Sequence, residues 1–523
     1  MLSLLRFQLS TLDLVALVLF ALVLVFSEFR RSWLRIPHKV TAPESCVRRK
    51  TVRDVPGPTA LPLLGTQWLF SAFGPYKLSK MHEAYQELKH KYGRIVREEA
   101  TWNIPVISLF EKEAIERVAH YPSKAPVRPP TLITVFYRAT VPERYASAGL
   151  VNEQGERWQT LRNSLTPDLV SSRVISRFQP ELDRVAEDFL VSLRSQRDRS
   201  SNRVANFEDF AKYMGLESTC TLILGRRMGF LDSEPDSRCV RLAQAVTGHF
   251  RACRDTYYGL PLWKIFPSSA YDLYKAAEEQ YYDIISELVE EALKEENETC
   301  ATESVRHIFM SILRAHNLDI REKKAAIVDF IAAGIVTLGN TLVFLLHLVA
   351  THPNVQQRLY EELTAASESA ERLSGQELRN VPYLHAVVQE CYRIRPTAIC
   401  VARILEEDME LSGYDLPAGT PVLCQNWLAC LDEANFTNAK KFCPERWMPG
   451  EISYKNFSPS LVKPFGFGRR VCPGKRFVDQ MLHTILAKMV CEFHIEYEGE
   501  MEMQFEFLMV PASPVNLILR DRQ

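Results

Sequence analysis

Cysteine is sparse in this chain of 523 residues, and no two cysteines form a CxxC pair. A zinc ribbon or a thioredoxin-like redox protein therefore has no support. Twelve cysteines are also too few for a disulfide-rich scaffold in a chain of this length. We expect mostly reduced thiols in a reducing compartment.

An excess of charge of one sign is also missing. Lys and Arg number 63 against 64 Asp and Glu, which does not fit a general nucleic-acid binder. Hydrophobic residues make up 46% of the chain, too many for a wholly disordered protein. The sequence has no internal repeat, no low-complexity tract and no flavin or nicotinamide fingerprint. One large globular enzyme domain fits these limits.

The N-terminus departs from this average composition. Leu14 to Phe26 is an apolar run of 13 residues, which needs its flanks to span a membrane, and a basic stretch from Arg30 to Arg53 follows it. A mitochondrial presequence and a reticulum signal anchor both fit, whereas secretion lacks a small-residue cleavage site. We expect residues 1–54 to be a membrane-anchor or targeting segment, at the matrix side of the mitochondrial inner membrane or at the endoplasmic reticulum.

The rest of the chain, residues 55–523, is interpreted as one domain. It opens with the proline-rich stretch Val55-Pro56-Gly57-Pro58, which blocks helix formation. Hydrophobic periodicity predicts a mainly α body with a minor β portion. Helices are expected over 77–92, 156–166, 176–195, 272–296 and 354–367, strands near 93–109, 404–411, 420–424 and 507–519, and a surface loop over 195–205.

One apolar segment has two interpretations. Phe330 to Ala350 contains no Lys, Arg, Asp or Glu, so hydropathy alone allows a second membrane span and a membrane protein without a cofactor. Polar residues such as Asn340 and His347 lie within it, and the helical pattern starts earlier among charged residues. A helix through the middle of a large protein is also apolar on all faces.

The most informative local pattern is the loop Phe465-Gly466-Phe467-Gly468-Arg469-Arg470-Val471-Cys472-Pro473-Gly474. Glycines let backbone amides approach the Cys472 sulfur, and those amides, with Arg469 and Arg470 beside them, would stabilise a thiolate. Zinc needs further ligands that the segment lacks, whereas haem iron takes a single axial cysteine thiolate. Cys472 is therefore predicted to be the metal ligand; a buried free cysteine is the alternative.

This loop resembles the haem-binding signature of the cytochrome P450 family, Phe-x-x-Gly-x-Arg-x-Cys-x-Gly. The signature places Phe465, Arg470, Cys472 and Gly474 around the cofactor. The resemblance covers about residues 55–520 and implies the P450 fold, with haem b (iron protoporphyrin IX) buried between a long central helix and the Cys472 loop. It also implies a haem-thiolate monooxygenase, which inserts one atom of O2 into a C–H bond of its substrate.

Further motifs follow the order and spacing of the family. Glu390 and Arg393 match its Glu-x-x-Arg pair, and Arg446, in a Pro-Glu-Arg segment, would join them in a buried structural network. Taken alone, the first two would be an ordinary surface ion pair on one helix face. The resemblance also assigns haem-propionate contacts to a group of four residues. They are Trp158, Arg162, Arg403 and Arg470.

Ala333-Gly334-Ile335-Val336-Thr337 resembles the oxygen-binding helix of the family. The resemblance gives Gly334 the role of opening the helix face beside the iron, and Thr337 the role of relaying protons to bound dioxygen. Val336 occupies the position at which the family motif has Asp or Glu. Protons would therefore pass through Thr337, water or Asn340. A haem-binding sensor that does not oxygenate is an alternative. Thr337 also has a purely structural alternative, in which its hydroxyl donates to the main-chain carbonyl four residues earlier in the helix.

Electrons must come from a partner protein, since no cofactor fingerprint for them is present. Residues 440–476 hold nine basic and two acidic residues, a field that would attract an acidic donor; a solvated charged face is the alternative. Lys475-Arg476 resembles the mitochondrial clan of the family, which implies a ferredoxin, with a flavoprotein reductase as the alternative. His385 and Gln389 stand where that clan usually has basic residues.

The residues 329–346 and 393–398 resemble arthropod steroid hydroxylases of this clan, which implies a steroid substrate and O2. Another steroid hydroxylase or a detoxifying monooxygenase of the clan is the alternative. By family position, the substrate pocket would be lined around Ala333 and Thr337, by Ala398–Val401 and by Met509–Pro511.

Overall fold

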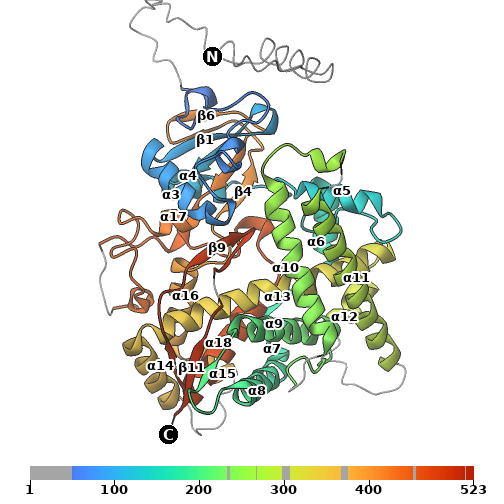
Figure 1. The fold of residues 1–523 in the computed structure, drawn as a ribbon, viewed down its shortest axis with the longest axis vertical. Coiled ribbons are helices and arrows are strands. Elements are labelled where there is room, and N and C mark those ends of the chain that lie inside the picture. Colours follow the sequence, from blue (N-terminus) through green and yellow to red (C-terminus); the bar gives the residue numbers. More distant parts are fainter. Residues whose placement is uncertain are drawn as a thin grey trace, which may run out of the picture.

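The computed structural model describes residues 50–522 apart from 233–235, 267, 297–306, 367–374, 451–454 and 513. Of the expected anchor or targeting segment 1–54, residues 1–49 lie outside the described residues. Helices dominate the fold (Figure 1). They are α3 Met81–Tyr92, α4 Lys112–Ala119, α5 Leu132–Thr140, α6 Gly155–Leu165, α7 Ser172–Arg177, α8 Gln179–Gln196, α9 Phe207–Leu224, α10 Ser237–Tyr257, α11 Ser269–Glu296, α12 His307–Arg314, α13 Ile320–Ala350, α14 Pro353–Ala366, α15 Gly375–Arg379, α16 Pro382–Ile394, α17 Asn426–Cys430 and α18 Lys475–Glu492.

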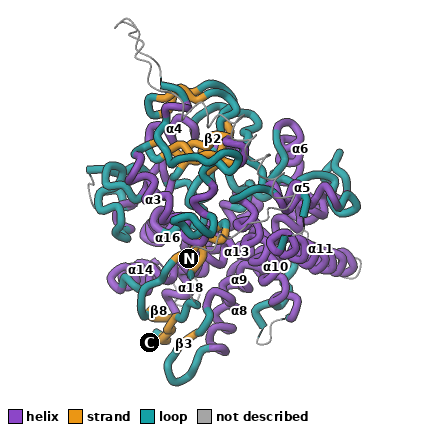
Figure 2. The backbone as a smooth tube through the Cα atoms, turned by 45° about the horizontal axis from the view of Figure 1, so that its top comes forward, coloured by secondary structure: helices purple, strands orange, loops and turns teal. Residues whose placement is uncertain are grey.

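The strands form small sheets at the edges of the helical body (Figure 2). They are β1 Ile95–Ala100, β2 Ile104–Leu109, β3 Arg203–Val204, β4 Val401–Ile404, β5 Met409–Leu411, β6 Tyr414–Leu416, β7 Pro421–Cys424, β8 Phe493–Tyr497, β9 Met503–Glu506, β10 Leu508–Pro511 and β11 Leu517–Asp521. The largest sheet has the order β1-β2-β7-β4, with β2 and β7 parallel and the other pairs antiparallel. The expected mainly α fold with a minor β portion is confirmed.

Two local predictions were wrong. The single helix expected over 176–195 is divided into α7 and α8 at Phe178, and Pro180 opens the second helix, where its missing N–H costs nothing. The loop expected over 195–205 ends in β3, which pairs with β11 from the far end of the chain. Such a distant pairing leaves no trace in local periodicity.

Helix α13 runs through the centre of the molecule (Figure 1). It is the one helix among the described residues that is long and apolar enough to cross a membrane, and 78% of its most apolar window is buried inside the protein. Leu338, Leu342 and Phe344 are fully buried in the main hydrophobic core. The segment Phe330–Ala350 is therefore a core helix, and the alternative of a second membrane span is wrong.

Glycines allow α13 and α9 to lie unusually close. A Cβ on Gly215 of α9 would lie 2.8 Å from the Ile335 carbonyl oxygen, and one on Gly339 of α13 would lie 3.1 Å from the Ala211 carbonyl oxygen. Larger residues at these positions would push the backbones apart. This packing fixes the position of the α13 turn that holds Ala333 and Thr337.

Candidate active site

The Cys472 loop is shaped by its own backbone. Gly466 and Gly468 take φ angles of 75° and 64°, which favour glycine, and the Cys472 amide donates to the Phe465 carbonyl at 2.9 Å. Cys472 comes just before α18, so the first amides of that helix lie near its sulfur. The Phe465 ring packs edge-on against Tyr392 of α16, with centroids 5.2 Å apart.

The electrostatics of Cys472 differ from the sequence prediction. The amides of Gly474 and Lys475 and the charge of Arg162 lower the pKa of the thiol, as amides aimed at sulfur should, but burial outweighs them and the net pKa is raised. Arg469 and Arg470 are not the arginines that act on the sulfur. Arg469 is exposed and donates to the Lys124 carbonyl, whereas Arg162 donates to the Val471 carbonyl at 2.9 Å beside the sulfur.

Four arginines gather next to this loop. Arg470 is buried, and its guanidinium lies 4.0 Å from the Trp158 ring of α6. Arg403 of β4 donates to the Phe467 carbonyl at 2.7 Å. Burial and repulsion by Arg128, Arg403 and Arg162 lower the pKa of Arg470 to about 9, and burial lowers that of Arg403 to about 10. These cations hydrogen-bond to carbonyl oxygens and the Gln154 amide, and among the described residues they hydrogen-bond to no carboxylate.

This donor set fits the two propionates of haem b. Nη1 of Arg470 is buried without a hydrogen-bond partner. A buried guanidinium N–H without a hydrogen-bond partner, close to three other cations, favours the binding of an anion. Carboxylates are the usual partners of arginine at such positions. A soft sulfur ligand lies on the adjacent loop at Cys472. The residues present therefore suit a group that carries both a metal and two acidic arms.

The opposite wall is the middle turn of α13. Ala333 is exposed and Thr337 is half-buried, although the residues around them on the helix are buried in the core. Their accessible surface must face an internal space. The Thr337 hydroxyl donates to the Ala333 carbonyl at 2.6 Å, which is the alternative that the sequence left open. Within the described part of the chain, the hydrogen bonds of Thr337 are made inside α13 and not with the Cys472 loop.

Gly334 has a different structural role from the one expected. Its missing side chain faces α9, because a Cβ there would lie 2.2 Å from the Thr219 hydroxyl oxygen. The glycine therefore makes room for a threonine of the neighbouring helix, a packing role that was not expected, and its role beside the iron stays a prediction. Thr219 gave no signal in the sequence, since nothing local pairs it with Gly334.

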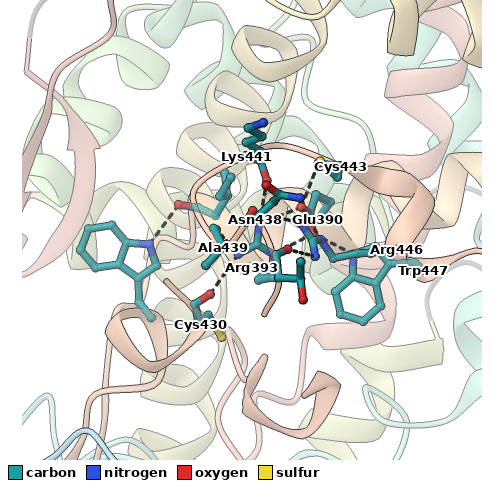
Figure 3. A network of polar contacts seen from close by, with 12 residues as sticks. Glu390, Arg393, Cys430, Asn438, Ala439, Lys441, Cys443, Arg446 and Trp447 are labelled. Atoms are coloured by element: carbon teal, nitrogen blue, oxygen red, sulfur yellow. Dashed lines mark hydrogen bonds and ion pairs between the residues drawn. The ribbon is translucent and has the colours of Figure 1, made fainter. Parts of the chain in front are cut away.

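Glu390 is the centre of a separate, buried ionic network (Figure 3). Glu390 accepts from Arg393 at 2.8 Å and from Arg446 at 2.9 Å, and all three side chains are buried. The Trp447 indole N–H and the Cys443 main-chain N–H also donate hydrogen bonds to the Glu390 carboxylate, at 2.9 and 3.0 Å. The arginines in turn donate to main-chain carbonyls of residues 430 and 437–441. The surface ion pair considered for the first two residues is excluded.

The structure thus gathers most of the predicted residues into two groups. One holds Cys472, Phe465, Gly474, Trp158, Arg162, Arg403 and Arg470; the other holds Glu390, Arg393 and Arg446. Sequence reasoning missed Arg128, which stands in a proline-rich loop with no motif, and Trp447, whose indole role shows only in three dimensions. Of the basic residues in 440–476, Arg446 and Arg470 are buried. Lys440, Lys441, Lys455, Arg469, Lys475 and Arg476 are exposed.

Comparison with known proteins identifies the class. The sequence profile of the family described as Cytochrome P450 matches residues 55–519. The chain belongs to the cytochrome P450 family. It is accordingly a monooxygenase that binds haem b and uses O2 with electrons from a redox partner.

Three individual members of the family are similar to this chain over most of its length. The chain is 48% identical over 488 residues to "Ecdysone 20-monooxygenase" of Drosophila melanogaster, an alignment that covers 91% of this chain and 90% of the relative. It is 29% identical to "Cytochrome P450 302a1, mitochondrial" of Drosophila melanogaster, over 91% of this chain and 97% of that one. It is 26% identical to "Cytochrome P450 27C1" of Danio rerio, over 92% and 89% of the two chains.

Proposed function

We propose that the protein hydroxylates the steroid ecdysone at C20 and releases 20-hydroxyecdysone. The observation that carries this proposal is the 48% identity to an ecdysone 20-monooxygenase across nearly the whole chain. The resemblance of residues 329–346 and 393–398 to these enzymes agrees with it. Holoenzyme supplied with NADPH, a ferredoxin and its reductase should convert ecdysone to a product identical in mass spectrum to 20-hydroxyecdysone. Oxidation at another carbon would reject the assignment.

In this proposal the Cys472 loop and the arginines hold the cofactor. Bound haem would supply the activation of O2, and the Cys472 sulfur would hold its iron. The amides of Gly474 and Lys475 stabilise the negative charge on that sulfur. Arg162, Arg403 and Arg470, together with Arg128, neutralise the two propionates. The Glu390 network fixes the chain that leads into the Cys472 loop.

The hydroxyl of Thr337 is the group that we propose to hold and pass protons. It reaches the internal space beside Ala333, and it has lone pairs left while it donates to the Ala333 carbonyl. Val336 is buried and cannot carry a proton. Water held by Thr337 would then supply the protons that an acid provides elsewhere in the family.

A small acidic ferredoxin is the proposed electron donor. The exposed basic side chains near the Cys472 loop include Arg469, Lys475 and Arg476, and they form a positive surface. A surface of this kind speeds encounter with an acidic protein at low ionic strength. Turnover with a ferredoxin should therefore fall as salt rises, and efficient turnover with a flavoprotein reductase alone would contradict this choice.

Membrane attachment is the last part of the proposal, with residues 1–54 as the anchor or targeting segment and 55–523 as the catalytic domain. Large apolar side chains stay exposed near the start of the described chain and between α10 and α11, among them Phe73 at 98%, Trp102 at 65% and Ile265 at 73%. Their segments are joined, because Gly259 contacts both Gln67 at 2.8 Å and Thr101 at 3.2 Å. Relatives whose names include "mitochondrial" favour the mitochondrial inner membrane over the reticulum, and fractionation of cells distinguishes the two.

A further inference from the structure

A buried carboxyl group lies in the large sheet, away from the cofactor site. Glu98 of β1 is 6% exposed and pairs with Val106 of β2. Side chains alternate along a strand, so Glu98 shares the sheet face of Val96, which belongs to the main hydrophobic core. An acidic side chain on this face is rare, because burying it without a partner is unfavourable.

The partners of the Glu98 carboxyl group among the described residues are hydroxyl groups. Its Oε2 accepts from the Ser108 hydroxyl at 3.0 Å, and the Tyr85 hydroxyl also interacts with the carboxyl group. The Tyr85 and Tyr258 hydroxyls lie 3.3 Å apart. Burial raises the pKa of Glu98 to about 7, and the hydroxyls of Ser108 and Tyr85 oppose that shift only in part. A carboxylate has about four acceptor positions, so two hydroxyls leave it room for more donors.

This cluster adjoins the space where the substrate is expected. Glu98 lies close enough to Cys400 and Tyr257 for its charge to raise the pKa of both side chains. Tyr257, at the end of α10, is 46% exposed, so its ring is accessible to a bound molecule. That ring lies 6.2 Å from Phe507, at the turn between β9 and β10.

The same space extends toward α13. The Met509 amide of β10 donates to the Thr397 carbonyl at 2.8 Å, which brings the β9–β10 hairpin against residues 397–400. The Asn340 amide reaches the Met509 carbonyl at 3.5 Å, one turn along α13 from Thr337. The segments that surround Glu98 are therefore linked, contact by contact, to the wall beside Ala333.

We propose that Glu98, with Tyr85 and Tyr258, binds a hydroxyl group of the steroid and selects polyhydroxylated steroids over apolar ones. This inference rests on the proposed function and names how that site recognises its substrate class. An ecdysteroid carries several hydroxyl groups, and one of them can donate to the Glu98 carboxyl. A site built to hydrogen-bond a substrate hydroxyl discriminates strongly against an analogue without it, because its own buried polar groups are then left unpaired.

Equilibrium dialysis of the holoenzyme tests the proposal, with ecdysone and 2,22,25-trideoxyecdysone as ligands. The measured quantity is the ratio of their dissociation constants. Glu98→Leu should lower the preference for ecdysone at least about tenfold, the usual worth of a hydrogen bond to a charged group, and Glu98→Gln should lower it less. Glu99→Gln is the matched control, since Glu99 is equally buried on the opposite face of the strand, and it should leave the ratio unchanged.

The ratio of dissociation constants distinguishes a loss of recognition from a general loss of structure, because a loosened fold would weaken the binding of both ligands to the same extent. A ratio within twofold of wild type in both Glu98 variants, in protein with full haem content, would overturn the inference. The proposed function is judged separately by the product that the wild-type enzyme forms from ecdysone. Wild type that makes 20-hydroxyecdysone while the Glu98 variants keep its ratio would reject only the role of Glu98. If the Glu98 variants change the ratio but the wild type does not form 20-hydroxyecdysone, only the proposed 20-hydroxylation would be rejected.

Discussion

The α-carbon of Gly334 lies against the hydroxyl of Thr219, so closely that an added Cβ would be 2.2 Å from its oxygen. Gly334→Ala should therefore force α9 and α13 apart and lower the free energy of unfolding by about 1–3 kcal/mol, the usual cost of overpacking. Urea unfolding of the purified protein measures it.

A second substitution tests this cause. Thr219→Ala removes the two closest atoms, and its remaining Cβ would be 3.0 Å from the alanine methyl at position 334. The double variant should recover part of the lost stability. Equal instability of Gly334→Ala with and without Thr219→Ala would show that the contact does not limit the packing.

The Glu390 carboxylate contacts both Arg393 and Arg446 in the buried network. Glu390→Gln removes the negative charge that these two buried cations share, which should cost about 3–5 kcal/mol and reduce the yield of haem-containing protein. Glu445→Gln serves as control, because that carboxylate accepts from Tyr383 at the edge of the network. Similar losses for both variants, measured as haem per folded protein, would contradict the central role of Glu390.

Arg470→Gln and Arg403→Gln should each speed the loss of haem to an acceptor such as apomyoglobin roughly tenfold, since a charge-assisted hydrogen bond is worth about 1.5–3 kcal/mol. Arg469→Gln removes the same charge from an exposed neighbour that donates to the Lys124 carbonyl, and it should leave the rate unchanged. Equal rates in all three variants would show that the buried cations do not hold the propionates.

Thr337→Ala should lower the amount of product formed per NADPH consumed, by about tenfold or more, because positioned proton transfer contributes at least that much. Thr337→Ser keeps the hydroxyl and should retain most of the yield. The lost electrons should appear as hydrogen peroxide, which a peroxidase assay measures. An unchanged yield in Thr337→Ala would place proton delivery in another group.

The raised pKa of Glu98 predicts how stability depends on pH. The folded protein holds this proton up to about pH 7, whereas the unfolded chain releases it near 4.5, so the free energy of unfolding falls as pH rises through this window. The fall amounts to about 3 kcal/mol at most. Glu98→Gln should remove this part of the slope between pH 5 and 8 in urea titrations, and an identical slope in both proteins would contradict the assignment.

The sequence predicted features that local pattern or family spacing encodes. The i,i+3 spacing of Glu390 and Arg393 placed both on one helix face, and the Cys472 loop was recognisable from its glycines. Features created by distant contacts were missed. Arg128 faces Arg470 only because the chain folds back, and the reason for Gly334 lies on a helix more than 100 residues away. The loop amides that were expected to act on the Cys472 sulfur do so, whereas the arginine that acts on it, Arg162, comes from a distant helix and was not expected in that role.

Arg393 and Arg446 donate hydrogen bonds to main-chain carbonyls of residues 437–441, which precede the Cys472 loop; the Lys441 carbonyl is one of them. Every amino acid offers this oxygen, so the anchor places no demand on the side chains that it holds. Lys440 and Lys441 point to solvent from the same stretch. The exposed side chains of this stretch can therefore change during evolution, and with them the surface charge that a partner protein meets, while the main-chain anchor before the Cys472 loop stays in place.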